Sequence, residues 1–227
     1  MDKALIIGAS RGIGAGLVGE HLRRGWQVTA TARGQSDDLA TLRKSYSDRL
    51  QLDTADINVP STIAALAKRH EGQTFDLLFL NAGIMVGRGV PLPDVPDTGI
   101  NAIFLTNAVS PIRAADALLG FVKAGGTIAF MSSILGSIGT NEDGRAELYR
   151  ASKAALNSLV RSFRARHKDK ALTVLALHPG VVRTAMGGPQ APLDIATSVT
   201  GVADVLAKRR GTGGQAFVDY RNEIIPW

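Results

Sequence analysis

The sequence has no cysteine, few aromatic residues and no long apolar run. Without cysteine it can form neither a disulfide nor a thiolate metal site, and its four histidines lack metal-ligand spacing, so we expect no metal. Aromatic residues make up only 5% of the chain and the basic residues behind the net charge of +6 are dispersed, which argues against a nucleic-acid partner. The apolar run Ala4–Ile7 is too short for a signal peptide, and the uncharged stretch 124–141 is interrupted by glycine and serine. We therefore expect a soluble, cytoplasmic protein that does not bind membranes.

A chain of 227 residues with 45% hydrophobic content is long enough for one well-buried domain and short for two, so we expect a single domain over 1–227. Short β-branched or apolar runs alternate with segments of helical period, which indicates repeated βαβ units. The pattern predicts strands at Lys3–Ile7, Trp26–Ala32, Leu50–Leu52, Phe75–Leu80, Thr127–Met131, Thr173–Leu177 and Ala216–Val218, and helices near 13–24, 38–45, 61–70, 99–119, 147–167 and 195–208. This order predicts an α/β Rossmann fold, a doubly wound parallel sheet of about seven strands with helices on both faces and the ligand at the carboxyl ends of the strands.

A glycine-rich turn follows the first predicted strand and opens the first predicted helix. It reads Gly8-Ala-Ser-Arg-Gly12-Ile-Gly14. Missing side chains allow a tight turn and close approach of a phosphate, and the helix N-terminus offers free amides to a pyrophosphate. Glycines alone are weak evidence, and we interpret Gly125 and Gly126 as an ordinary turn. The position between strand and helix nevertheless predicts a dinucleotide site.

The spacing Gly-x-x-x-Gly-x-Gly resembles that of the short-chain dehydrogenase/reductase family. Further motifs follow in family order: Asn81-Ala82-Gly83, Ser132-Ser133, Tyr149-Arg-Ala-Ser-Lys153 and Pro179-Gly180. The resemblance spans nearly the whole chain. Two positions depart from the family pattern: Ile7 replaces a threonine whose hydroxyl braces the turn, and Leu80 replaces a frequent asparagine. The chain endings near 187–194 and 214–220 further resemble the carbonyl-reductase-like branch that includes Sniffer and C-factor-related proteins.

Tyr149 and Lys153 are four residues apart, so a helix places them on one face. A free tyrosine has a pKa of about 10, and a nearby ammonium favours the phenolate. We therefore expect Lys153 to lower the pKa of Tyr149. The alternative interpretation of this pair is a surface aromatic–cation contact on an ordinary helix.

The family resemblance implies a catalytic role for four side chains. Tyr149 would exchange a proton with the substrate oxygen, Ser133 would hydrogen-bond that oxygen, and Lys153 would also hold the nicotinamide ribose. Asn107 matches the family's helix asparagine, which positions a water next to the lysine. Ser132 is the alternative to Ser133, because the segment between Gly139 and Glu147 is longer than usual.

The cofactor preference is predicted from charge. NAD-specific folds carry a carboxylate at the end of the second strand, where this chain has Ala32 followed by Arg33, and Arg11 lies inside the glycine turn. Two guanidinium groups can bind a 2′-phosphate, so we expect NADP(H), the alternative being that both arginines are only solvated. For the adenine we prefer Asp56 with Ile57 over Asp53. The residues expected to contact the cofactor are Gly8, Ser10, Arg11, Gly12, Ile13, Gly14, Arg33, Asp56, Ile57, Asn81, Ala82, Gly83, Tyr149, Lys153, Pro179, Gly180, Val182 and Thr184.

These features predict hydride transfer between NADP(H) and a carbonyl or alcohol, with reduction of a hydrophobic ketone or aldehyde as the favoured direction. The variable segments 84–96, 134–148 and 185–195 would close the pocket, whose apolar side chains are Ile84, Met85, Val86, Ile134, Leu135 and Met186. The family habit implies a homodimer or homotetramer. One alternative is a catalytically idle signalling or interaction protein of C-factor type that retains the cofactor site. Another is a methyltransferase, in which the Tyr149–Lys153 pair would have no purpose.

Overall fold

The computed structural model describes residues 1–227, and its core is one parallel sheet of seven strands in the order β3-β2-β1-β4-β5-β6-β7. The strands are β1 (Lys3–Ile7), β2 (Gln27–Ala32), β3 (Leu50–Thr54), β4 (Phe75–Leu80), β5 (Val122–Met131), β6 (Thr173–His178) and β7 (Gln215–Asp219). Every residue of β4 and β6 is buried, as expected for central strands covered on both faces. Strands β1 to β3 are added toward one edge of the sheet and β4 to β7 toward the other, so the order reverses between β1 and β4. This creates the switch point where α/β sheets bind ligands.

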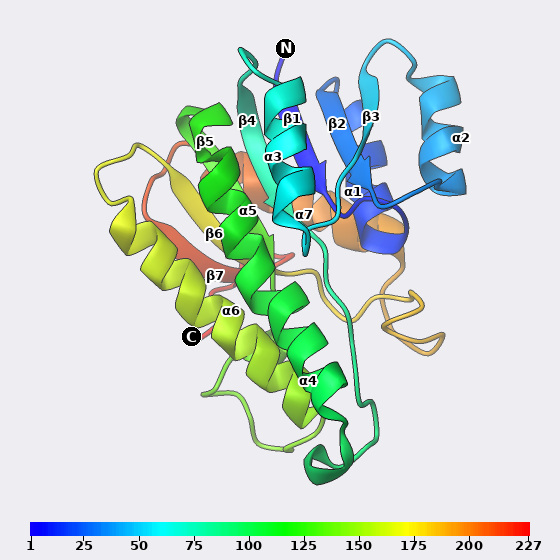
Figure 1. The fold of residues 1–227 in the computed structure, drawn as a ribbon, viewed down its shortest axis with the longest axis vertical. Helices are drawn as coiled ribbons and strands as arrows, with labels where there is room; N and C mark the ends of the chain where they lie inside the picture. Colours follow the sequence, from blue (N-terminus) through cyan, green and yellow to red (C-terminus); the bar gives the residue numbers. More distant parts are fainter.

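Helices cover both faces of this sheet (Figure 1). They are α1 (Gly12–Arg23), α2 (Asp37–Ser45), α3 (Pro60–Arg69), α4 (Asp97–Phe104), α5 (Ser110–Leu118), α6 (Glu147–Arg166) and α7 (Ile195–Arg209). Apolar residues of α1, α2 and α7 form the core on one face, and those of α3, α5 and α6 form the core on the other. The single-domain Rossmann architecture and all seven predicted strands are thus confirmed.

Strand β5 begins earlier than the sequence predicts. It starts at Val122 and includes Gly125 and Gly126, which the sequence indicated to be an ordinary turn. Gly125 has a φ of +78°, and the pairing of β4 with β5 shifts register between Phe75 and Leu77. The two glycines therefore form an irregularity within a strand, which residue type alone does not distinguish from a turn.

The single helix predicted over 99–119 consists of two helices joined by a π-helical segment, Leu105–Val109, which contains Asn107. A π segment inside an α-helix often marks a functional position. The whole run Asp97–Phe121 has the length and mean hydropathy (1.2) of a membrane-spanning helix, but 56% of its apolar window is buried within the protein. The apolar residues of this run pack against α3 and α6, so they belong to the core of the protein.

Candidate functional site

The glycine turn after β1 packs so closely that side chains are excluded. Gly8 has a φ of +84°, and a Cβ there would lie 2.7 Å from the backbone nitrogen of Ala82. A Cβ on Gly14 would lie 2.5 Å from the carbonyl oxygen of Gly8 and 2.7 Å from Asn81 Nδ2. Asn81 Nδ2 also donates a hydrogen bond of 2.8 Å to the Gly8 carbonyl. The turn is therefore held against the end of β4, and it leaves the start of α1 open to a phosphate.

Two hydroxyl groups that the sequence did not single out support this turn. Thr31, fully buried on β2, accepts a hydrogen bond from Gly8 N at 3.3 Å, and its carbonyl accepts one from Ala9 N at 2.8 Å. The Ser36 hydroxyl donates to the carbonyl of Ser10 and accepts from Leu39 N at the start of α2. Thr31 pairs in register with Ile7. Its hydroxyl therefore supports the turn from the neighbouring strand, in place of the threonine hydroxyl that the family has at position 7.

Arg11 and Arg33 lie on exposed backbone at the same edge of the sheet. Arg11 precedes the first residue of α1 and Arg33 follows the last residue of β2. Neither guanidinium forms an ion pair or a side-chain hydrogen bond. Ala32 is buried, and no carboxylate occupies this end of β2. Both arginines are therefore free to bind an anion.

The structure separates the roles of the two aspartates after β3. The Asp53 carboxylate forms an ion pair with Arg69 at 2.7 Å and contacts His70 Nε2 at 3.0 Å. Its role is therefore structural, because it links β3 to the end of α3. The Asp56 carboxylate accepts only from the backbone nitrogen of Asn58, at 2.9 Å, and Asp56 remains half-buried next to the buried Ile57. This arrangement favours Asp56 as the ligand-facing carboxylate.

Tyr149 and Lys153 lie one turn apart on α6, and both are buried, with exposed fractions of 9% and 2%. Ser133, which follows β5, hydrogen-bonds to the Tyr149 phenol. Ser132 instead donates to Asn157 Oδ1 at 2.6 Å, away from the tyrosine. Of the two serines, Ser133 is thus the one that shares a site with Tyr149, and the exposed-surface interpretation of the tyrosine–lysine pair does not fit its burial.

The expected effect of Lys153 on Tyr149 is not found. Burial raises the pKa of Tyr149 to about 12, and the bond with Ser133 opposes that rise without overcoming it. Burial also lowers the pKa of Lys153 to about 8. Lys153 Nζ donates to the Met131 carbonyl at 2.8 Å and lies 5.8 Å from the centre of the tyrosine ring. Loss of solvent is therefore the largest influence on both pKa values, and residue spacing cannot reveal it.

Asn107 is fixed by the protein on every side. Its Oδ1 accepts from Ile84 N at 2.8 Å, and its Nδ2 donates to the Ile84 carbonyl at 2.8 Å and to Ser152 Oγ at 3.0 Å. A Cβ on Gly83 would lie 3.4 Å from Asn107 Oδ1 and 3.5 Å from Lys153 Nζ. Asn107 and Lys153 thus meet at Gly83, and the asparagine ties the segment after β4 to the helix that carries the tyrosine. Its role toward a water stays a prediction.

The segment after β6 reaches back to the glycine turn. Val182 is buried and bridges to Leu193, while Thr184 Oγ1 accepts from Gly187 N at 3.0 Å. A Cβ on Gly12 would lie 3.6 Å from Thr184 Cγ2. Pro179 and Gly180 form the corner, where Pro179 accepts from Ser198 Oγ at 2.7 Å. The predicted cofactor residues on both sides of the switch point therefore converge.

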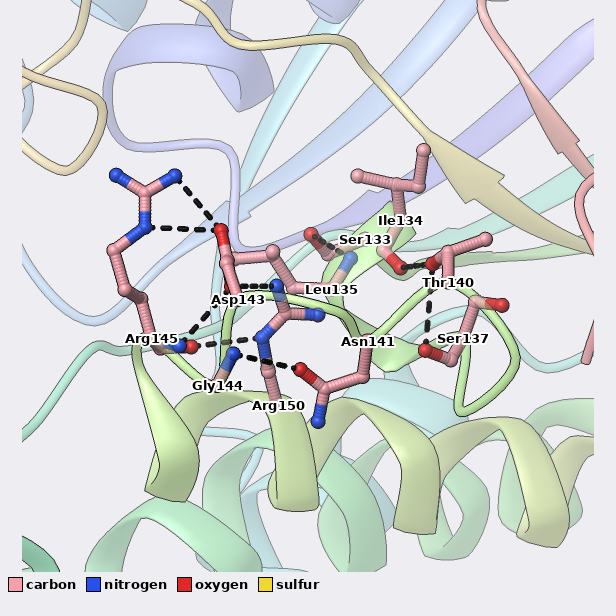
Figure 2. A network of polar contacts seen from close by, with 10 residues as sticks. All are labelled: Ser133, Ile134, Leu135, Ser137, Thr140, Asn141, Asp143, Gly144, Arg145 and Arg150. Atoms are coloured by element: carbon pink, nitrogen blue, oxygen red, sulfur yellow. Dashed lines mark hydrogen bonds and ion pairs between the residues drawn. The ribbon is translucent and has the colours of Figure 1, made fainter.

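The lengthened segment between Gly139 and Glu147 is anchored by Arg150, which directly follows Tyr149 (Figure 2). Arg150 Nη2 contacts Asp143 Oδ1 at 2.7 Å, and its Nε donates to the carbonyl of Arg145 at 2.7 Å. Arg150 is buried, with only 8% exposed. No local pattern predicts this anchor, because Asp143 and Arg150 belong to a loop and a helix whose contact depends on the fold.

Apolar side chains pack around Tyr149. Tyr149 forms a buried cluster with Val95, Ile103 and Leu148, and partly buried neighbours pack against it: Ile84, Met85, Val86, Ile100, Phe104, Leu135 and Met186. Five of the six predicted pocket residues belong to this set. Ile134 does not, since it is 38% exposed. The site can therefore pair a proton-donating phenol with an apolar molecule.

Comparison with known proteins agrees with this geometry. Residues 2–192 match the short chain dehydrogenase family. A short-chain dehydrogenase/reductase from Burkholderia multivorans with bound NADP is 44% identical, with a TM-score of 0.97 over 100% of this chain and 99% of that one. The carbonyl reductase Sniffer of D. melanogaster is 31% identical, with a TM-score of 0.89 over 100% of both chains.

A further relative is C-signal of Myxococcus xanthus, 37% identical over 67% of this chain and 92% of its own length. The family match covers residues 2–192, a range that includes the glycine turn and the buried tyrosine–lysine pair. This chain belongs to the short-chain dehydrogenase family, within the branch of the Sniffer and C-factor-like proteins.

Proposed function

We propose that this protein is an NADP(H)-dependent carbonyl reductase that acts on apolar ketones or aldehydes. The observation that carries the proposal is the burial of Ser133, Tyr149 and Lys153 together beside an apolar cluster, at the sheet edge that also bears the glycine turn. Oxidoreduction with NADP follows from the family and from the bound NADP of the Burkholderia relative. The carbonyl substrate and the role of each side chain are the proposed part.

The chain has the groups needed to hold the cofactor. The glycine turn would receive the pyrophosphate at the N-terminus of α1, because Gly8 and Gly14 allow a close packing of the turn that a Cβ at either position would disrupt. Arg11 and Arg33 would bind the 2′-phosphate, and Asp56 with Ile57 would face the adenine. The nicotinamide end would meet residues of two segments, Asn81–Gly83 after β4 and Val182 with Thr184 after β6. When bound, the cofactor supplies the hydride.

Tyr149 is suited to the direction of reduction. A pKa of about 12 keeps the phenol protonated at neutral pH, so it can donate its proton to a carbonyl oxygen as negative charge develops there. Ser133 bonds to the same phenol and would stabilise that oxygen with its hydroxyl. Lys153, held by the Met131 carbonyl, keeps a positive charge behind the tyrosine below pH of about 8. The apolar cluster excludes water from the reacting atoms.

The test is NADPH oxidation with a panel of apolar ketones and aldehydes. Tyr149→Phe should reduce kcat/KM about 10²–10⁴-fold, the range for loss of a general acid, while NADPH still binds. Tyr46→Phe is the matched control, because Tyr46 is half-buried at the end of α2, outside the site. Activity that survives Tyr149→Phe unchanged would refute the proposed mechanism.

The relationship to C-signal favours one other function, a signalling or interaction protein that binds the cofactor without turnover. In that case NADPH would raise the melting temperature, but no carbonyl in the panel would be reduced. Saturable reduction that depends on Tyr149 excludes this alternative. A homodimer or homotetramer remains a prediction, to be measured by size-exclusion chromatography with light scattering.

A further inference from the structure

Arg88 lies on a turn beside the apolar cluster. Gly87 and Gly89 on either side of it adopt left-handed conformations, with φ of +68° and +72°, and Val90 N donates to the Gly87 carbonyl at 3.1 Å. A Cβ on Gly87 would also lie 2.9 Å from Val95 Cγ2, so the turn is pressed onto the cluster. The backbone at Arg88 is therefore held at a defined place beside the cluster.

The guanidinium of Arg88 joins the two segments that flank the cluster. Its Nε donates to Met85 Sδ at 3.1 Å, and its Nη2 donates to the carbonyl of Met186. Met85 and Met186 both pack against the cluster that contains Tyr149. Arg88 thus lies at the rim of the apolar site, one layer of side chains from the proposed acid.

The positive charge of Arg88 has no partner in the protein. It is exposed and forms no ion pair, whereas Arg145, Arg150 and Arg183 near the same edge each face an aspartate. Its Nη1 makes no hydrogen bond, so this side of the guanidinium is free. An unpaired, positioned arginine is the group best suited to bind a carboxylate.

We propose that Arg88 binds the anionic end of the substrate, so that the preferred substrates are oxo acids with an apolar body between the carbonyl and the carboxylate. This proposal rests on the carbonyl reductase activity proposed above. The apolar cluster would hold the body of the molecule and place its carbonyl at Tyr149 and Ser133. The carboxylate would remain at the solvent-facing rim with Arg88.

The test compares 7-oxooctanoate, whose methylene chain lies between the ketone and the carboxylate, with its methyl ester, which has the same apolar body and ketone without the charge. Wild-type protein should show the higher kcat/KM for the acid, and added salt should reduce that advantage. Arg88→Gln should raise KM for the acid about tenfold, as expected for an exposed charge-assisted bond, and change KM for the ester less than about twofold. Arg88→Lys should restore part of the preference. Arg113→Gln, another exposed and unpaired arginine, on α5, should change neither KM.

Two results would overturn the assignment. One is an equal change of KM for acid and ester in Arg88→Gln, which would mean that Arg88 only joins the two segments. The other is reduction of uncharged carbonyls by wild-type protein with no preference for the acid. If no carbonyl compound is reduced at all, the proposed function itself fails, and the two failures are thereby distinguished.

Discussion

Replacing Lys153 by methionine should stabilise the protein at neutral pH. Burial lowers the pKa of this lysine from 10.5 to about 8, so at pH 7 the folded state holds an ammonium that it disfavours. Between these two values the unfolded chain binds more protons than the folded one, and stability therefore rises with pH. The difference of about 2.5 units corresponds to a penalty of about 3 kcal/mol at pH 7, which falls to about 1 kcal/mol at pH 9.5.

Methionine removes this penalty but also removes the bond to the Met131 carbonyl, which costs about 1 kcal/mol. The net gain for Lys153→Met is about 2 kcal/mol at pH 7, or about 4–8 °C in melting temperature for a chain of this size, and it should vanish near pH 9.5. Urea denaturation of the cofactor-free protein at both pH values measures the change. Lys68→Met, at an exposed helical lysine, serves as the control and should show no such pH dependence. A stability change of equal size at both pH values would refute the reasoning.

Two further predictions concern the cofactor site. Arg33→Ala and Arg11→Ala should each weaken NADPH binding about tenfold and leave NADH binding nearly unchanged, as measured by cofactor fluorescence; equal losses for both cofactors would contradict a 2′-phosphate role. Thr31→Val keeps the side-chain shape but removes the acceptor for Gly8 N, so NADPH should bind about fivefold more weakly, from a loss of about 1 kcal/mol. Thr29→Val, at a buried threonine two residues earlier on β2, is the control, and a similar loss there would show a general effect on the strand.

The order of the strands and the positions of the main motifs could be predicted from the sequence, because continuous apolar runs and punctuating glycines are local signals. The helix carrying Asn107 shows the limit of such signals. Its apolar period continues through the π segment, so the change from α to π geometry leaves no mark in the pattern. Ser132 and Ser133 are likewise equivalent as residues, and only the contact with Tyr149 separates them.

Energetic properties were less predictable than positions. Spacing indicated correctly that Tyr149 and Lys153 share a helix face, but it gave the wrong direction for the tyrosine pKa, because the extent of burial comes from segments far away in the chain. The support of the glycine turn by Thr31 was hidden for a similar reason. It depends on the register of β1 with β2, which places Thr31 beside Ile7.

The contacts of the glycine turn also bear on the order in which parts of the protein are synthesised and fold. Its hydrogen-bonding partners Thr31, Ser36 and Asn81 all precede β5 in the chain, whereas Ser133, Tyr149 and Lys153 all follow the start of that strand. A ribosome that has released the chain through β4 has therefore delivered each of these hydrogen-bonding partners, but no part of the proton-donating group. Because a domain generally folds as a unit, the turn is synthesised first but reaches its final packing only when β5 and the later strands are available.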